Sequence, residues 1–160
     1  MSSGFPKPML CSLTEWSINH IRDVFEAPSD EEALRAIEQT FSLSVTATLN
    51  GSPLPREGII KLVLSMRQGG RMGGGSGLRV NWKHTVEVPA DPVTNRDGSF
   101  GGVYVITGLR KILPDFNRPV TFSRHKSVNV KIESQSPDTH LDSRRIVSLV
   151  FVASDVQDKP

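Results

Sequence analysis

The chain of 160 residues lacks the features that mark several large protein classes. Cys11 is its only cysteine, so an intrachain disulfide is excluded. No apolar run approaches the roughly 20 residues that a membrane-spanning helix needs. The stretch from Met1 to Leu13 has no apolar segment of the kind found in secretory signals. We therefore expect a cytoplasmic protein with no membrane as partner.

Charge of one sign is also scarce, because 19 Lys and Arg residues stand against 17 Asp and Glu, for a net charge of +2. Nucleic-acid-binding proteins usually carry a clustered basic face, so nucleic acid is not an expected partner. The histidines, His20, His84, His125 and His140, are scattered and lack the paired spacing of a metal site. The Gly-rich stretch 69–77 has no G-K-[ST] and is not a phosphate loop. We expect neither a metal nor a cofactor.

The first half of the chain carries helical patterns. Ser12 with Glu15, and Ser29 with Glu32, match capping boxes that open two short amphipathic helices, the first stopped by Pro28. A third apolar face runs from Pro55 through Arg67 and predicts another helix. The segment 68–77 that follows is rich in glycine and is expected to hold no single conformation.

Strand patterns make up the rest. Residues 41–49 alternate apolar and polar side chains and predict a half-buried strand, closed by the turn Asn50-Gly51. Its expected buried side carries Phe41, Leu43, Val45, Ala47 and Leu49. Four further strands are predicted over 78–88, 100–109, 120–133 and 145–153. Within the second of them, Gly101-Gly102 marks a bulge or a close backbone approach.

This order of elements predicts an α+β fold in which three N-terminal helices pack on the concave face of one strongly bent, mainly antiparallel sheet. Residues 1–11 are expected to form a flexible arm, residues 12–155 a single domain, and residues 156–160 a C-terminal tail. Any function is then expected in the space between the helices and the sheet.

The chain resembles the nuclear transport factor 2-like superfamily, also called SnoaL-like or ketosteroid-isomerase-like. The resemblance spans Ser12 to Asp155 and rests on the element order, on residues 41–51 leading into 53–58, and on the long C-terminal strands. It implies a cone-shaped fold and a homodimer formed through the outer sheet face. Members of the superfamily include isomerases, dehydratases, cyclases, hydrolases and non-catalytic binding domains, so the fold does not select a function.

His84 is the candidate catalytic residue. It shares a strand face with Trp82 and Val86 in the period-two pattern, so it is expected to point inward. An inward imidazole is either a general base in a pocket or a core side chain satisfied by backbone or water.

Four aromatic side chains are candidates for lining a pocket: Trp16, His20, Trp82 and Tyr104. In the resembled fold the first helix closes the cone, which puts Trp16 and His20 at its mouth; the alternative for His20 is a partly exposed polar shoulder. Tyr104, the only tyrosine, either orients a carbonyl group inside the cone or covers the sheet with its hydroxyl in water.

Arg124 and Lys126 interrupt an apolar strand face that a strict period of two would bury. A bulge near His125 that turns both outward is the favoured explanation, and the alternative is a polar cavity for an anionic group. Glu87 and Glu133 fall on the polar faces of their strands, so no interior carboxylate is identified.

These patterns favour a non-catalytic binding module. It would hold a small apolar molecule in an interior pocket or a protein partner on its surface. The alternative is an isomerase, dehydratase or cyclase in which His84 acts as the base on a small apolar substrate.

Overall fold

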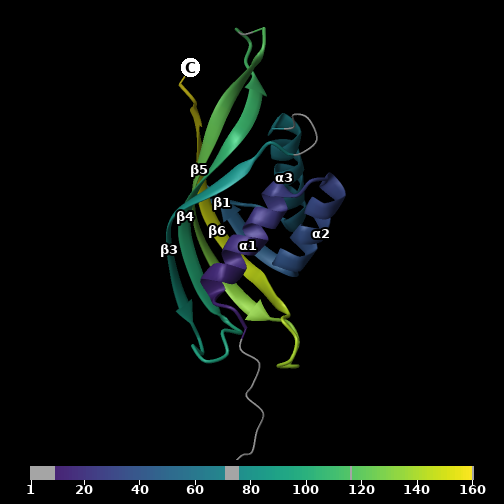
Figure 1. The fold of residues 1–160 in the computed structure, drawn as a ribbon, viewed down its shortest axis with the longest axis vertical. Helices are drawn as coiled ribbons and strands as arrows, with labels where there is room; N and C mark the ends of the chain where they lie inside the picture. The colour runs from purple at the N-terminus through teal and green to yellow at the C-terminus, as the bar shows by residue number, and fades with distance from the viewer. Residues whose placement is uncertain (1–9, 71–75, 116, 160) are drawn as a thin grey trace, which may run out of the picture.

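The computed structural model describes residues 10–70, 76–115 and 117–159 (Figure 1). The expected arm therefore falls mostly outside the described residues, as do residues 71–75 of the glycine-rich segment and the final residue of the expected tail. The helices are α1 (Leu13–Glu26), α2 (Asp30–Thr40) and α3 (Arg56–Gly70), and β1 and β2 lie between α2 and α3 in the sequence. The strands are β1 (Phe41–Leu49), β2 (Ser52–Pro53), β3 (Arg79–Pro89), β4 (Gly98–Ile112), β5 (Pro119–Ser134) and β6 (Arg144–Gln157).

The strands form one six-stranded sheet in the order β2-β1-β6-β5-β4-β3. Only the pair β1–β6 is parallel, and the other neighbours are antiparallel. The three helices lie together on one side of the bent sheet (Figure 1). The predicted α+β architecture is thus confirmed. Strand β6 continues to Gln157, beyond residue 155 where the sequence pattern placed the end of the domain.

The N-cap hydrogen bond of each predicted capping box forms. The Ser12 hydroxyl oxygen accepts a hydrogen bond of 3.0 Å from the backbone N–H of Glu15. The Ser29 hydroxyl accepts one of 3.1 Å from the N–H of Glu32 and donates one of 3.1 Å to the Glu32 carboxylate. Each cap satisfies an N–H group that the first helical turn leaves without a partner, which explains why α1 and α2 begin where the sequence predicts.

A buried arginine joins the three helices. Arg67 of α3 is 1% exposed, and its Nη1 donates a 3.0 Å hydrogen bond to the carbonyl of Phe25 in the last turn of α1. Its Nε donates a 3.0 Å bond to Asp30 at the start of α2. Ser76 binds the same Phe25 carbonyl at 2.7 Å, so the chain leading into β3 is tied to the end of α1 as well.

In the part of the chain that the structure describes, no helix is both long and apolar enough to span a bilayer.

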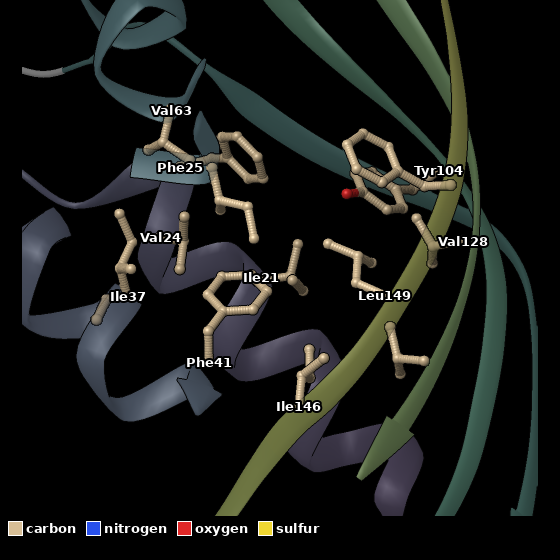
Figure 2. Close-up of a cluster of buried hydrophobic side chains, with 14 of the residues drawn as sticks. Ile21, Val24, Phe25, Ile37, Phe41, Val63, Tyr104, Val128, Ile146 and Leu149 are labelled. Atoms are coloured by element: carbon tan, nitrogen blue, oxygen red, sulfur yellow. The ribbon is translucent and has the colours of Figure 1, made fainter. Parts of the chain in front are cut away.

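The core fills the space between the helices and the concave face of the sheet (Figure 2). Side chains of Ile21, Val24 and Phe25 from α1 face Val128 of β5 and Leu149 of β6. Burial of such side chains stabilises the fold by roughly 1.5–3 kcal/mol each, so this layer supplies most of the driving force for packing the helices on the sheet.

The expected alternation in β1 is wrong at Leu43, which is 86% exposed. Phe41 pairs with Ile146 and Thr46 with Ser148, so five steps along β1 match two along β6. This irregularity leaves extra residues in β1 and changes which face each side chain takes. Phe41 and Val45 stay buried, while Leu43 turns to the solvent.

The irregularity in β1 predicts unequal effects of one substitution at two leucines. Leu149→Ala removes a side chain that is 8% exposed and should lower the free energy of unfolding by about 2–5 kcal/mol. Leu43→Ala should change it by less than about 0.5 kcal/mol, because its side chain already lies in water. Urea denaturation of both variants measures the difference, and a comparable loss at Leu43 would contradict the observed course of β1.

Candidate functional site

A bulge in β3 decides which of its side chains face the helices. Trp82 pairs with Tyr104, but His84 pairs with the adjacent Val103, so Lys83 is the extra residue on β3. Trp82 therefore faces the helices, whereas His84 is exposed on the outer face of the sheet. The expectation that His84 points inward is wrong, because the bulge changes the phase of the alternation between the two residues.

The same shift moves Glu87 from the face on which the sequence pattern placed it. Its carboxylate accepts a 2.6 Å hydrogen bond from the Thr14 hydroxyl and a 3.2 Å bond from the Thr14 N–H, both at the start of α1. A carboxylate at this end of a helix is also favoured by the helix dipole. Glu87 thus anchors α1 to β3 and does not line the cavity described below.

The concave side of the sheet encloses a small cavity of about 40 Å³ with α1 and α3. For comparison with this volume, a single water molecule needs roughly 10–15 Å³. The walls of the cavity are almost entirely apolar. The lining residues that carry a polar group are Ser17, Trp82, Tyr104 and Lys126. The remaining wall is formed by Ile21, Val24, Phe25, Phe41, Ile59, Leu62, Val63, Phe100, Val128, Val130, Ile146, Leu149 and Phe151.

Two of the four predicted pocket residues, Trp82 and Tyr104, line this cavity, and Trp16 and His20 do not. Trp16 is 2% exposed and stacks on His20 with ring centroids 4.1 Å apart. The His20 Nδ1–H donates a 2.8 Å hydrogen bond to the Trp16 carbonyl, and burial lowers the pKa of His20. Trp16 also contacts Arg144, whose guanidinium lies 5.7 Å from its ring centroid.

Arg144 explains why Trp16 belongs to the core rather than to the cavity. The guanidinium is fully buried and donates hydrogen bonds to the Cys11 carbonyl at 2.7 Å and to the Asn95 carbonyl at 3.0 Å. It also holds the Asp142 carboxylate at 2.9 Å and so keeps the pKa of Asp142 below its ordinary value, although burial opposes this. Trp16 packs against this junction of the chain before α1, the β3–β4 turn and β6.

Lys126 points into the cavity. Strand β5 keeps an unbroken register here, with Tyr104 opposite Lys126 and Val105 opposite His125, so the favoured bulge near His125 is wrong. Lys126 is 4% exposed, and its Nζ lies 4.6, 5.2 and 5.6 Å from the ring centroids of Phe25, Phe151 and Tyr104. Cation–π attraction to these rings partly offsets the loss of hydration.

Arg124 also turns toward the helix side, but it has a counter-ion. Its Nε and Nη2 donate hydrogen bonds of 2.6 and 2.9 Å to the two carboxylate oxygens of Asp155, which also binds Lys111. The hydrogen bond from Arg124 is the main reason that the pKa of Asp155 is lowered to about 2. This pairing fits a bidentate Arg–carboxylate contact and leaves Lys126 as the charged side chain that faces the cavity.

Burial lowers the pKa of Lys126 to about 7, and the nearby positive charge of Arg124 acts in the same direction. Asp155 acts in the opposite direction but is engaged by Arg124 and Lys111. Near neutral pH the amine is therefore present in both the charged and the neutral form. Among the described residues it has no hydrogen-bond partner.

The other polar groups of the cavity are equally unpaired within the described chain. Ser17 Oγ and Trp82 Nε1 are buried without a hydrogen-bond partner. The hydroxyl oxygen of Tyr104 points from the sheet toward the helices (Figure 2), and burial raises the pKa of Tyr104, so the hydroxyl stays protonated. The alternative in which this hydroxyl lies in water is wrong, since Tyr104 is 3% exposed.

Of the residues described, none that lines the cavity is a histidine or a carboxylate. The described part of the chain also has no cluster of His, Cys, Asp and Glu suited to hold a metal ion. From the sequence, Lys126 was placed in a polar cavity only by the alternative that was not favoured, and Ser17 was not identified at all. The signal for Lys126 was its place in the period-two pattern of β5, whereas Ser17 had no signal beyond lying on the helix.

The outer face of the sheet has a second hollow, of about 440 Å³. Its floor includes Gly101 and Gly102, and Val86, Val150 and Val152 around it are 63%, 52% and 53% exposed. The described residues that line it also include His84, Val103, Ser127 and Asn129, and none of the lining residues is a Lys, Arg, Asp or Glu. The absence of a side chain at Gly102 allows the Trp82 ring to pack directly on the backbone of β4, because a Cβ there would lie 2.5 Å from that ring.

Comparison with known proteins identifies the fold. No protein-family model and no curated protein matches the chain. Among solved structures, the C. albicans Mtr2–Mex67 M domain complex matches with a TM-score of 0.53 at 12% identity, over 92% of this chain and 96% of that chain. The protein Rd1NTF2_04 with long sheet matches with a TM-score of 0.50 at 8% identity, over 86% and 97% of the two chains.

At such low sequence identity, structural similarity shows the fold alone. The chain has the nuclear transport factor 2-like fold that the sequence resemblance implied. A SnoaL-like family protein from Agrobacterium tumefaciens aligns over 86% of this chain and 93% of its own, at 10% identity and a TM-score of 0.45. At that score the likeness adds nothing to the assignment of the fold.

The burial of Lys126 predicts a pH-dependent cost to stability. In the unfolded chain its pKa returns to about 10.5, so between about pH 7 and 10.5 the unfolded state binds the extra proton. This difference makes the free energy of unfolding rise with pH by about 1.4 kcal/mol per unit in that window, and the full cost is present below pH 7.

Lys126→Met keeps the length of the side chain and removes the amine. The variant should be more stable than the wild type at pH 7, and its advantage should shrink as the pH approaches 10. Urea denaturation of both proteins from pH 6.5 to 10 gives the difference, in which other titrating groups largely cancel. An advantage that stays constant over this range would contradict the placement of Lys126.

Proposed function

We propose that the protein is a non-catalytic interaction module that pairs with a second copy of itself through the outer face of its sheet. The observation that carries this proposal is the uncharged, valine-rich hollow over β3 to β6. Protein interfaces are depleted of charged residues at their centres, and this surface has that character although it lies in solvent in the single chain.

Several features support a second copy as the occupant. The hollow carries no charge that would select a partner of opposite sign or repel an identical face. Most soluble oligomers are symmetric, and a two-fold axis through this face would let valines from one copy fill the hollow of the other. The similar structure of Mtr2 and Mex67 is that of a complex, so a domain of this fold occurs there bound to another protein.

The alternative of an isomerase-type enzyme has less support. It depends on an interior base, and His84 lies on the outer face of the sheet. The cavity is small and contains neither imidazole nor carboxylate among the described residues that line it.

Cys11 is a free thiol, which suits the reducing cytoplasm that we propose as the protein's location.

A charge placed in the hollow should separate the copies. Val152→Arg puts a guanidinium where the side chain is now 53% exposed, and burying two such charges across a two-fold axis is unfavourable. The wild type should sediment at twice its 17.6 kDa mass, and the variant as a monomer with an unchanged far-ultraviolet spectrum. The measurement is sedimentation velocity at micromolar concentration.

Val93→Arg is the matched control. Val93 is 64% exposed, but it lies in the turn between β3 and β4, away from the hollow. It should leave the dimer intact. A wild-type protein that remains monomeric at high micromolar concentration, or a Val152→Arg variant that remains dimeric, would refute the proposed pairing.

A further inference from the structure

We infer that the cavity around Lys126 binds a small monocarboxylate with a short apolar tail, held by its carboxylate oxygens on the amine of Lys126 and the neighbouring hydrogen-bond donors. This inference concerns the interior of the cone and does not depend on pairing through the outer face. It rests on the polar groups of the cavity, on its walls and on its size.

The polar groups are the first support. Lys126 Nζ and Trp82 Nε1 can only donate hydrogen bonds. Trp82 Nε1 is buried without a hydrogen-bond partner, and the contacts of Lys126 Nζ within the described chain are with three aromatic rings. Ser17 Oγ, in a residue that is 1% exposed, is unpaired too. Buried polar groups in folded proteins are normally paired, so several unpaired ones around one cavity mark a place for a ligand.

The kind of donor determines the chemistry of the ligand. A group that satisfies Lys126 and Trp82 must offer acceptor oxygens, and no carboxylate of the described chain reaches the cavity to do so. An anion is preferred over a neutral acceptor, because the ammonium form of Lys126 lacks a counter-ion there and charge-assisted hydrogen bonds are the stronger ones.

Walls and volume determine the remainder of the ligand. Apart from the polar groups, the cavity is lined by aliphatic and aromatic side chains such as Ile21, Val63 and Leu149. These walls offer no partner for a second polar group on the ligand. A volume of about 40 Å³ admits only a few non-hydrogen atoms, so acetate fits it best, while propionate and butyrate test its upper limit and long-chain fatty acids are excluded unless the helices move.

Titration with sodium acetate, propionate and butyrate tests the inference, with ligand-observed NMR at pH 7 as the measurement. The wild-type protein should bind at least one of them at millimolar concentration. Butyramide, which has nearly the same shape and no charge, should bind at least about tenfold more weakly, because it cannot form the charge-assisted bond.

Two substitutions on β5 separate the site from a general effect of lysine. Lys126→Met should weaken carboxylate binding by at least about tenfold. Lys131→Met removes a lysine from the same strand whose side chain is 61% exposed, and it should leave the affinity unchanged. Tyr104→Phe, which keeps the ring and removes only the hydroxyl, should weaken binding several-fold and tests the site independently of Lys126→Met.

The pH dependence provides a second readout. Binding requires the protonated amine, so the affinity of the wild type should fall about tenfold per unit above about pH 7. Tyr104, Arg124 and Asp155 are the other ionisable groups near Lys126, and the helices contribute none to the cavity wall. Absence of binding for all three carboxylates, or equal binding by Lys126→Met, would overturn the inference.

Discussion

The bulge at Lys83 is the constraint on which both surfaces of the sheet depend. Before it, Trp82 packs against Tyr104 with ring centroids 4.5 Å apart and closes the interior. After it, His84 and Val86 reach the outer face, and Glu87 reaches α1. Lys83 is one additional residue in the edge strand β3. Because a shift of one position moves every following side chain to the opposite face of the sheet, this residue decides which side chains of β3 face the helices and which lie on the outer face.

The interior gives up stability to keep a buried polar group, the amine of Lys126. An aliphatic side chain at position 126 would extend the apolar face made by Val128, Val130 and Ile132 on the same strand. The sequence has a lysine there instead, surrounded by three aromatic rings and with no counter-ion in contact. Natural proteins keep such costly groups mainly where they act, since burial alone would favour their replacement.

Local rules predicted the elements well, and they failed where the sheet is irregular. The capping boxes and the period-two runs placed the helices and long strands, because both signals lie within a few neighbouring residues. The outcomes for Leu43, His84 and Lys126 depended on whether a strand is bulged, and this is decided by its pairing with distant strands. The period-two pattern was applied to β1 and β3 without a bulge, although each of these strands has an irregularity. For β5 a bulge near His125 was favoured, although the register there is unbroken.

The place of β6 has a consequence for how this chain is made. It follows the other described strands in the sequence, yet it lies between β1 and β5 and is the link between the two parts of the sheet. As the chain leaves the ribosome, the helices and β1 emerge long before the strand that joins them to β5, β4 and β3. Their apolar side must stay uncovered until then, so the fold cannot be completed before β6 has been made, and the uncovered surface invites chaperone binding in the interval.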